Sequence, residues 1–236
     1  MWDHLRSEVN AYSHQGERIV LPHLQVAVTD LVSMTRQGRV TLFGTDISDA
    51  FHQIPLDPAE RKFTATSFAG KFYLFRVLVF GATSAPTVWG RYAAFIGRSS
   101  AAILDGPGAR LHVYVDDPLY AIRGTEEEAV HTATIATMWL GVVGLPLAWH
   151  KTEAGPRLQW IGATIELHPD HVRISVLADK ISAVKDDLAS LQEAVTAPRR
   201  RFRQLAGRIN FVTGLVPPPP PSPAPPVGGW SQVSEP

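Results

Sequence analysis

The chain has 236 residues, of which 45% are hydrophobic, so it can bury a real core in one large domain or two small ones. Its 22 basic and 22 acidic residues balance, so a nucleic-acid partner must be argued from local patches and not from overall charge. Because the sequence has no cysteine, disulfides, thiolate nucleophiles and cysteine zinc sites are excluded.

The sequence shows no sign of a secretion signal or a membrane segment. Residues 1–18 are polar and mixed in charge, without the apolar core of a signal peptide. The longest nearly apolar run, residues 138–149, is too short and too rich in glycine and proline to span a bilayer. We therefore expect an intracellular protein, in the cytoplasm or the nucleus.

The first third of the chain is expected to form a helix, a strand and a β-hairpin, after weak helical character in residues 1–20. Pro22 opens the helix and Gly38 closes it. Two β-prone runs around Ala69-Gly70 predict the hairpin, and two prolines within residues 54–61 predict a turn ahead of it. The expected ranges are residues 22–36 for the helix, 40–46 for the strand, and 62–68 with 71–79 for the hairpin.

The middle of the chain alternates helices with strands. A glycine turn at Phe80-Gly81, an N-cap at Thr83 or Ser84, and Pro86 in the first turn predict a helix. Thr125, followed by three glutamates at the positive end of the helix dipole, begins another. The expected ranges are helices to about residues 99 and 141, hairpin strands at 111–116 and 119–122 with Asp116-Asp117-Pro118 at their tip, and a short strand at 145–149.

The last third is expected to form a hairpin, two helices and a proline-rich tail. Runs at residues 158–167 and 172–175 flank a turn, and the helices are expected at residues 177–195 and 198–215. The tail holds eight prolines between residues 217 and 226, which favours a disordered or polyproline-II extension. The whole order of elements predicts a two-layered α+β domain followed by a small helical appendage.

Two short carboxylate runs carry the candidate chemistry. Each follows a β-prone apolar stretch, and together they supply Asp46, Asp116 and Asp117. Three like charges at adjacent strand ends repel, and neutral pH tolerates them only with proton uptake or a bound cation. Hard oxygen ligands in an incomplete cage suit Mg²⁺ and the layout of two-metal phosphoryl or nucleotidyl transfer. An Asp-Asp pair alone is most often a solvated turn, so the interpretation depends on the segments between the two runs.

Six blocks between residues 21 and 215 occur in one order with ordinary spacing. They are Leu21-Pro22 with Asp30-Leu31, Asp46-Ile47-Ser48-Asp49-Ala50-Phe51-His52-Gln53-Ile54, Phe80-Gly81 with Ser84-Ala85-Pro86, Tyr114-Val115-Asp116-Asp117, Gly144-Leu145 through Lys151-Thr152 to Gly155-Pro156, and Leu158-Gln159-Trp160-Ile161-Gly162. Each block is weak alone, but the ordered set resembles the palm of a reverse transcriptase of the retrotransposon kind.

The resemblance implies an α+β polymerase palm, in which helices lie on one face of a ferredoxin- or RRM-like antiparallel sheet. It also implies partial fingers and a short helical thumb. The implied division is residues 1–40 for the partial fingers and first helix, 41–176 for the palm with a fingers hairpin, 177–215 for the thumb-like segment, and 216–236 for a disordered proline-rich tail.

The resemblance also implies catalytic roles. Asp46 and Asp116 would bridge two Mg²⁺ ions, for which Mn²⁺ is a possible substitute, with Asp117 nearby and the Ile47 carbonyl as a further ligand. One metal would lower the pKa of the primer 3′-hydroxyl, and the other would hold the triphosphate. Lys151 would act as general acid to the leaving pyrophosphate; a surface lysine at a strand end is an equal alternative.

Further residues are implied to contact nucleotide and primer. Phe51 would lie under the incoming sugar and exclude a 2′-hydroxyl, with ordinary core packing as the alternative. Phe80 and Gly81 would border the nucleotide and the templating base, where a missing side chain allows close backbone approach. Trp160, Ile161 and Gly162 would form a primer grip. Contacts to the backbone of the template–primer duplex, or simply a solvated basic face, are implied for Arg199, Arg200, Arg201, Arg203 and Arg208.

Three departures from the family pattern stand out. Val79 replaces the proline usual before Phe-Gly, Pro118 directly follows the aspartate pair, and residues 1–20 lack a convincing basic block for the triphosphate. The resemblance implies an RNA-directed DNA polymerase core that adds dNTPs to a primer on an RNA or DNA template, cut from a larger polyprotein. The alternatives are an inactive relic or nucleic-acid-binding module of the same fold, and an RNA-dependent RNA polymerase, against which Phe51 argues. The oligomeric state stays open.

Overall fold

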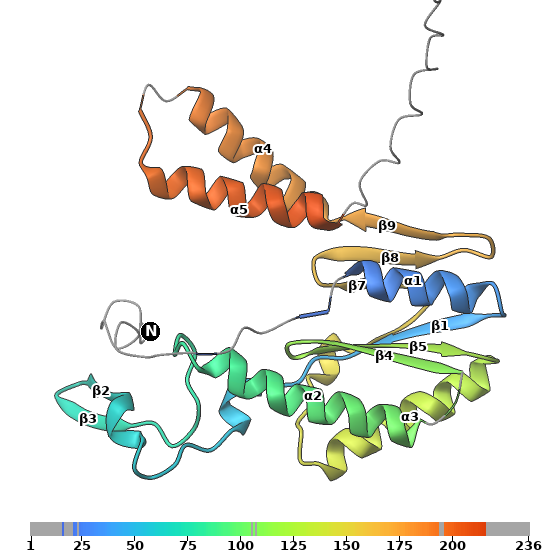
Figure 1. The fold of residues 1–236 in the computed structure, drawn as a ribbon, viewed down its shortest axis with the longest axis horizontal. Coiled ribbons are helices and arrows are strands. Elements are labelled where there is room, and N and C mark those ends of the chain that lie inside the picture. Colours follow the sequence, from blue (N-terminus) through green and yellow to red (C-terminus); the bar gives the residue numbers. More distant parts are fainter. Residues whose placement is uncertain are drawn as a thin grey trace, which may run out of the picture.

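The computed structural model describes residues 16, 21–22, 24–104, 106, 108–193 and 196–215. Its main sheet is antiparallel, with strand order β4-β5-β1-β6 (Figure 1). The strands are β1 Val40–Gly44, β4 Ala109–Tyr114, β5 Asp117–Arg123 and β6 Glu153–Gly155. The central strand β1 pairs with β5 along its whole length and with β6 only over Leu42–Gly44. The α+β class predicted from the sequence is confirmed.

Helices cover one face of the main sheet, and a helix with a second sheet covers the other. Side chains alternate along β1, so Leu42 joins the core under α1 while Phe43 joins the core under α3. The helices are α1 Leu24–Thr35, α2 Ala85–Ile103 and α3 Glu126–Val142, and the second sheet is β7 Arg157–Trp160, β8 Ala163–Leu167 and β9 Val172–Val176. The predicted helical face thus belongs to α2 and α3, and α1 lies opposite because its apolar stripe packs against β1 and β5.

The helix starts follow the sequence signals to different degrees. Thr125 and Glu128 form a complete capping box ahead of α3, with Thr125 Oγ1 accepting from the Glu128 N–H at 3.2 Å. Ser84 is the N-cap of α2, but its side chain makes no capping hydrogen bond. Pro86 in the first turn of α2 supplies the preset φ instead.

The predicted hairpins are present, and one tip is shifted. β2 Ala65–Phe68 and β3 Lys71–Leu74 flank Ala69 and Gly70, which both have positive φ as in a type I′ turn. The β4–β5 hairpin closes with the pair Tyr114 and Asp117, so its tip is Val115-Asp116. The expectation of Asp116-Asp117-Pro118 at the tip was wrong, because pairing continues through Pro118, which stands opposite Val113.

The segment after α3 differs from the sequence prediction. The expected strand at residues 145–149 is only a single bridge between Leu147 and Ile47, followed by the 3₁₀ turn Trp149–Lys151. Pro146 has no N–H for a ladder, so this stretch crosses the end of β1 and does not extend the sheet. The short edge strand β6, which the sequence did not predict, follows that turn. Further 3₁₀ turns lie at Ala50–Gln53 and Arg61–Thr64.

The run at residues 158–167 forms two strands, β7 and β8, and not one. The C-terminal helices α4 Ala178–Gln192 and α5 Arg199–Leu215 match their predicted ranges and pack on each other (Figure 1). Most of the N-terminal stretch and the whole tail at residues 216–236 lie outside the described residues. Within the part that is described, no helix combines the length and apolar character that crossing a membrane needs.

Candidate active site

The two carboxylate runs meet at one end of the main sheet. Asp46 lies just beyond β1, Asp116 lies at the tip of the β4–β5 hairpin, and Asp117 begins β5. The backbone N–H of Ile47 donates a hydrogen bond to the carbonyl oxygen of Asp116 at 2.8 Å, which joins the two runs directly. The three aspartates that we expected to lie close together are therefore neighbours in the fold.

The segment after α3 holds the first run from the other side. The N–H of Ala148 donates to the carbonyl of Asp46 at 2.9 Å, and the N–H of Ser48 donates to the carbonyl of Pro146 at 2.9 Å. The hydroxyls of Thr45 and Thr152 lie 3.0 Å apart, within hydrogen-bond distance. The backbone around Asp46 is thus fixed on two sides before any ligand binds.

The tip of the second run carries backbone strain. Val115 has φ of +56°, a left-handed conformation that a β-branched residue rarely adopts. Pro118 adds no comparable problem, because the β1–β5 ladder ends at the pair Gly44–Leu119, so the missing N–H of Pro118 falls just past its end. The unusual proline after the aspartate pair is therefore accommodated, and the strain lies one residue before Asp116.

Burial and mutual repulsion raise the pKa values of the hairpin aspartates. The pKa of Asp117 rises to about 7, first because burial disfavours its charged form, and then because Asp116 and Asp46 repel it. Burial also raises the pKa of Asp116, and the charge of Asp46 raises it further. At neutral pH, ionising all three carboxylates therefore costs free energy, because burial and mutual repulsion disfavour their charged forms.

Lys151 lies at this cluster. Its Nζ donates to Asp46 Oδ2 at 3.0 Å, although the lysine side chain is 55% exposed. The hydrogen bond to Asp46 raises the pKa of Lys151 and keeps it protonated. Lys151 is thus a solvent-accessible ammonium group that is hydrogen-bonded to Asp46.

A divalent cation fits the chemistry of this set. Three neighbouring carboxylates, two of them with raised pKa values, are what a cation between them would relieve. The carbonyl of Ile47 belongs to the same loop as Asp46. Among the residues that the structure describes, however, no three Asp, Glu or His side chains are already arranged around a common metal position. The donor types fit, and their side chains would have to turn toward the ion.

The predicted nucleotide-site residues also come together. The ring of Phe51 stands edge-on to that of Phe80, with centroids 4.9 Å apart, and lies 6.4 Å from the ring of Trp89. Phe80 is 54% exposed, and Gly81 after it has φ of +88°. Phe51 is half-buried and packs on the core that contains Trp89. Phe51 therefore has the core packing that was its alternative interpretation, while its contact with a nucleotide sugar stays a prediction.

About two-thirds of the chain carries the family relationship. Residues 10–165 match the family described as reverse transcriptase (RNA-dependent DNA polymerase). The chain belongs to the reverse transcriptase family. The match includes both carboxylate runs and ends within β8.

Solved reverse transcriptase structures share the fold. The foamy viral protease-reverse transcriptase dRH in complex with double-stranded DNA aligns with a TM-score of 0.61 at 17% identity, over 86% of this chain and 32% of that one. Foamy viral protease-reverse transcriptase in complex with double-stranded DNA gives 0.56 at 17% identity, over 86% and 38%. Its complex with an RNA/DNA hybrid gives 0.51 at 17% identity, over 77% and 22%. This reverse transcriptase chain thus spans less than two-fifths of each.

The predicted primer grip is a tight turn with a buried support. Trp160 is only 1% exposed, and its Nε1–H donates to the carbonyl of Asp117 at 2.9 Å. Ile161 and Gly162 form the β7–β8 turn with φ of +40° and +77°. The ring of Phe211 on α5 covers Gly162 so closely that an added Cβ would lie 2.7 Å from its Cζ. Trp160 is therefore too buried to touch a primer, Gly162 is partly covered by Phe211, and a primer contact of this turn stays a prediction.

The predicted basic face divides into two groups. Arg208 bonds to Asp187 of α4, and Arg201 donates to Ser190 Oγ of α4 at 2.7 Å, so both help to join the two helices. The remaining three arginines of the set are exposed on α5: Arg199, Arg200 and Arg203. For these three, contact with a duplex stays a prediction.

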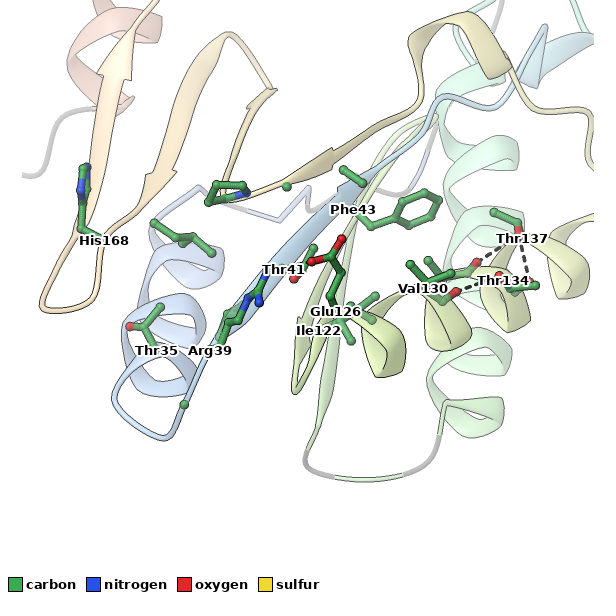
Figure 2. A pocket seen from close by; sticks show the side chains of 18 of the residues that line it. Thr35, Arg39, Thr41, Phe43, Ile122, Glu126, Val130, Thr134, Thr137 and His168 are labelled. Atoms are coloured by element: carbon green, nitrogen blue, oxygen red, sulfur yellow. Dashed lines mark hydrogen bonds and ion pairs between the residues drawn. The ribbon is translucent and has the colours of Figure 1, made fainter.

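A groove of about 900 Å³ lies away from the carboxylates, between β1, α3 and the β8–β9 turn (Figure 2). Arg39 and Glu126 form an exposed ion pair there, with 3.4 Å between Nη2 and Oε2. The aspartates of the candidate site do not line it. The groove is therefore separate from the candidate active site.

Trp89 is the main residue that the sequence reasoning missed. It is fully buried on α2, and its Nε1–H donates to the carbonyl of Val115 at 2.8 Å. The residues buried along α2 recur at helical spacing, which indicates an inward-facing tryptophan. That spacing does not indicate that the acceptor lies on the β4–β5 hairpin.

Proposed function

We propose that this chain is the core of an RNA-directed DNA polymerase of a retrotransposon-type element, which adds dNTPs to a primer by two-metal nucleotidyl transfer. The observation that carries the proposal is the meeting of Asp46, Asp116 and Asp117, joined by the hydrogen bond from Ile47 to Asp116. Membership of the reverse transcriptase family supports it.

The carboxylates would bind the metal ions, and the lysine would act as a general acid. Two Mg²⁺ ions, or Mn²⁺ in their place, would when bound activate the primer 3′-hydroxyl and hold the triphosphate. Asp46 and Asp116 would hold them, with Asp117 and the Ile47 carbonyl as further oxygens. Lys151, a protonated ammonium 3.0 Å from Asp46 Oδ2, would donate a proton to the leaving pyrophosphate.

The aromatic pair would select the nucleotide. Phe51, held by its contacts with Phe80 and Trp89, would press against the sugar and exclude a 2′-hydroxyl. Gly81 would allow the backbone to approach the base pair. This arrangement favours dNTPs over rNTPs.

The subdomains would divide the remaining work. Residues 1–40 would belong to the fingers, 41–176 to the palm, and 177–215 to a thumb, with a proline-rich extension at 216–236. The structural neighbours are complexes with double-stranded DNA or an RNA/DNA hybrid, which supports a template–primer duplex as partner. The turn at Ile161-Gly162 would contact the primer, and the exposed arginines of α5 would contact duplex phosphates.

A primer-extension assay tests the proposal. Wild type, Asp116→Asn and Asp186→Asn are compared on poly(rA)/oligo(dT) with Mg²⁺ and with Mn²⁺. Asp186 is an exposed residue of α4, so its variant controls for loss of one surface charge. We expect extension by wild type and Asp186→Asn and none by Asp116→Asn. A folded wild type that never extends the primer would refute the proposal.

A second candidate function is duplex binding without catalysis. The three exposed arginines on α5 favour it, because they could neutralise phosphates whether or not the carboxylates react. Salt-dependent binding of the duplex, together with no extension under either metal, would identify this function.

A further inference from the structure

Four consecutive carbonyls of the catalytic hairpin each accept a hydrogen bond from a separate donor. Trp89 Nε1 donates to Val115 at 2.8 Å, and Trp160 Nε1 donates to Asp117 at 2.9 Å. Between and after them, the N–H groups of Ile47 and Thr45 donate to Asp116 and Pro118 at 2.8 and 3.3 Å. The two backbone donors lie directly after β1, whereas the two indole donors are side chains of α2 and β7.

The two tryptophans reach the hairpin through different cores. Trp89 comes from α2 and is 0% exposed within the core that contains Ile47 and Ala50. Trp160 comes from β7 and is 1% exposed within the core that contains Leu42 and Leu119. A buried indole N–H needs an acceptor, and each finds it on a residue directly flanking Asp116.

The hairpin tip needs such support because it is strained. Val115 holds φ of +56°, and relaxation of this residue toward an extended conformation would rotate the peptide that leads into Asp116. A hydrogen bond to the Val115 carbonyl opposes that rotation directly. A second bond to the Asp117 carbonyl fixes the next peptide but one, between Asp117 and Pro118, while the Ile47 N–H holds the Asp116 carbonyl between them.

We propose that Trp89 and Trp160 are positioning residues that clamp the Val115–Asp117 backbone and so set the direction of the Asp116 and Asp117 carboxylates. Their importance for catalysis rests on the proposed polymerase function, whereas the clamp itself does not. Trp89 also adjoins Phe51, and Trp160 leads into the turn covered by Phe211. The clamp therefore links the hairpin to the nucleotide side and to α5.

The test removes each indole N–H and keeps an aromatic ring. Trp89→Phe and Trp160→Phe are compared with Trp139→Phe, a matched control whose Nε1 donates at 3.2 Å to Ser99 between α3 and α2. Amide hydrogen exchange is followed in peptides spanning residues 112–119. We expect these amides to exchange about 5- to 10-fold faster in the two clamp variants, the equilibrium factor of about one net hydrogen bond. Unchanged exchange there, or equal acceleration in Trp139→Phe, overturns the proposal.

A second readout follows the carboxylates without requiring turnover. Mn²⁺ alone is titrated into each protein and binding is read by electron paramagnetic resonance. We expect about 5- to 10-fold weaker binding in the clamp variants and unchanged binding in Trp139→Phe. Full-affinity binding in both clamp variants overturns the positioning role. If wild type fails primer extension yet the exchange and Mn²⁺ results hold, the polymerase proposal fails while the clamp stands.

Discussion

Replacing Asp117 by asparagine should make the metal-free protein more stable at alkaline pH. The pKa of Asp117 is about 7 in the folded chain against 3.8 for an unperturbed aspartate, mainly because of burial and then because of Asp116 and Asp46. A folded-state pKa raised above the unfolded value means that the folded state binds the proton more tightly. Stability from this group is therefore fully present below about pH 4 and is lost as pH rises through about 7.

The size of the effect follows from that pKa difference. A difference of about 3 corresponds to about 4 kcal/mol. Because the carboxyl is partly exposed and solvent screens its charge, we expect roughly half, about 2 kcal/mol, in the free energy of unfolding. Asparagine keeps the shape and carries no charge, so Asp117→Asn should lose less stability than wild type as pH rises across this window, with Asp116 contributing to the dependence that remains.

Urea unfolding at about pH 4.5 and about pH 8, without divalent cations, measures the effect. The advantage of Asp117→Asn over wild type should grow between the two pH values, while Asp186→Asn should track wild type. Added Mg²⁺ at about pH 8 should reduce the advantage, because the wild-type cluster of three carboxylates gains more from the cation than the two that remain in the variant. An asparagine variant less stable than wild type at about pH 8, or equally dependent on pH, would refute the reasoning.

Three further predictions concern catalysis and binding. Lys151→Ala should lower kcat for primer extension at least about tenfold, and Lys151→Arg should recover part of that loss. The free energy of unfolding should change by less than about 1 kcal/mol, because the ion pair with Asp46 is exposed. Equal kcat in all three proteins would exclude the lysine from proton transfer. Phe51→Ala should raise kcat/KM for rNTPs relative to dNTPs at least about tenfold, since removing the ring removes the clash with the 2′-hydroxyl. An unchanged ratio would mean that Phe51 only packs in the core and does not select the sugar. Replacing the three exposed α5 arginines by alanine should weaken duplex binding and reduce the slope of the logarithm of the binding constant against the logarithm of salt concentration by about 2 to 3. Fluorescence anisotropy at several salt concentrations measures this slope. An unchanged slope would indicate that these arginines form only a solvated face. That triple variant changes Arg199, Arg200 and Arg203.

Local sequence patterns predicted the parts of the fold that depend on neighbouring residues. The apolar stripe of α1, the helix start at Thr125 and the turn at Ala69-Gly70 each depend on residues a few positions apart. The meeting of Asp46 with Asp116 was also predictable, because strands that end on aspartate bring charge to the same sheet edge. The site's charged members could therefore be found in the sequence.

Features that depend on distant partners could not be predicted this way. Residues 145–149 look like a strand, but their partner segment lies beyond the end of β1, and only a single bridge forms, between Leu147 and Ile47. The hairpin tip lies at Val115-Asp116 because pairing with β4 continues through Pro118, which proline chemistry alone argues against. The role of Trp89 depends on an acceptor 26 residues away, and no spacing rule reports that contact.

The most direct test of the central claim is templated addition of a single nucleotide as Mg²⁺ is titrated. A poly(rA) template with an oligo(dT) primer is supplied with one dNTP at a time, using wild type, Asp116→Asn and Asp186→Asn. We predict that wild type and Asp186→Asn add dTTP alone in proportion to bound Mg²⁺, and that Asp116→Asn adds none. Addition by Asp116→Asn equal to wild type, or addition without regard to the template, would contradict the assignment of the carboxylate cluster as a polymerase site.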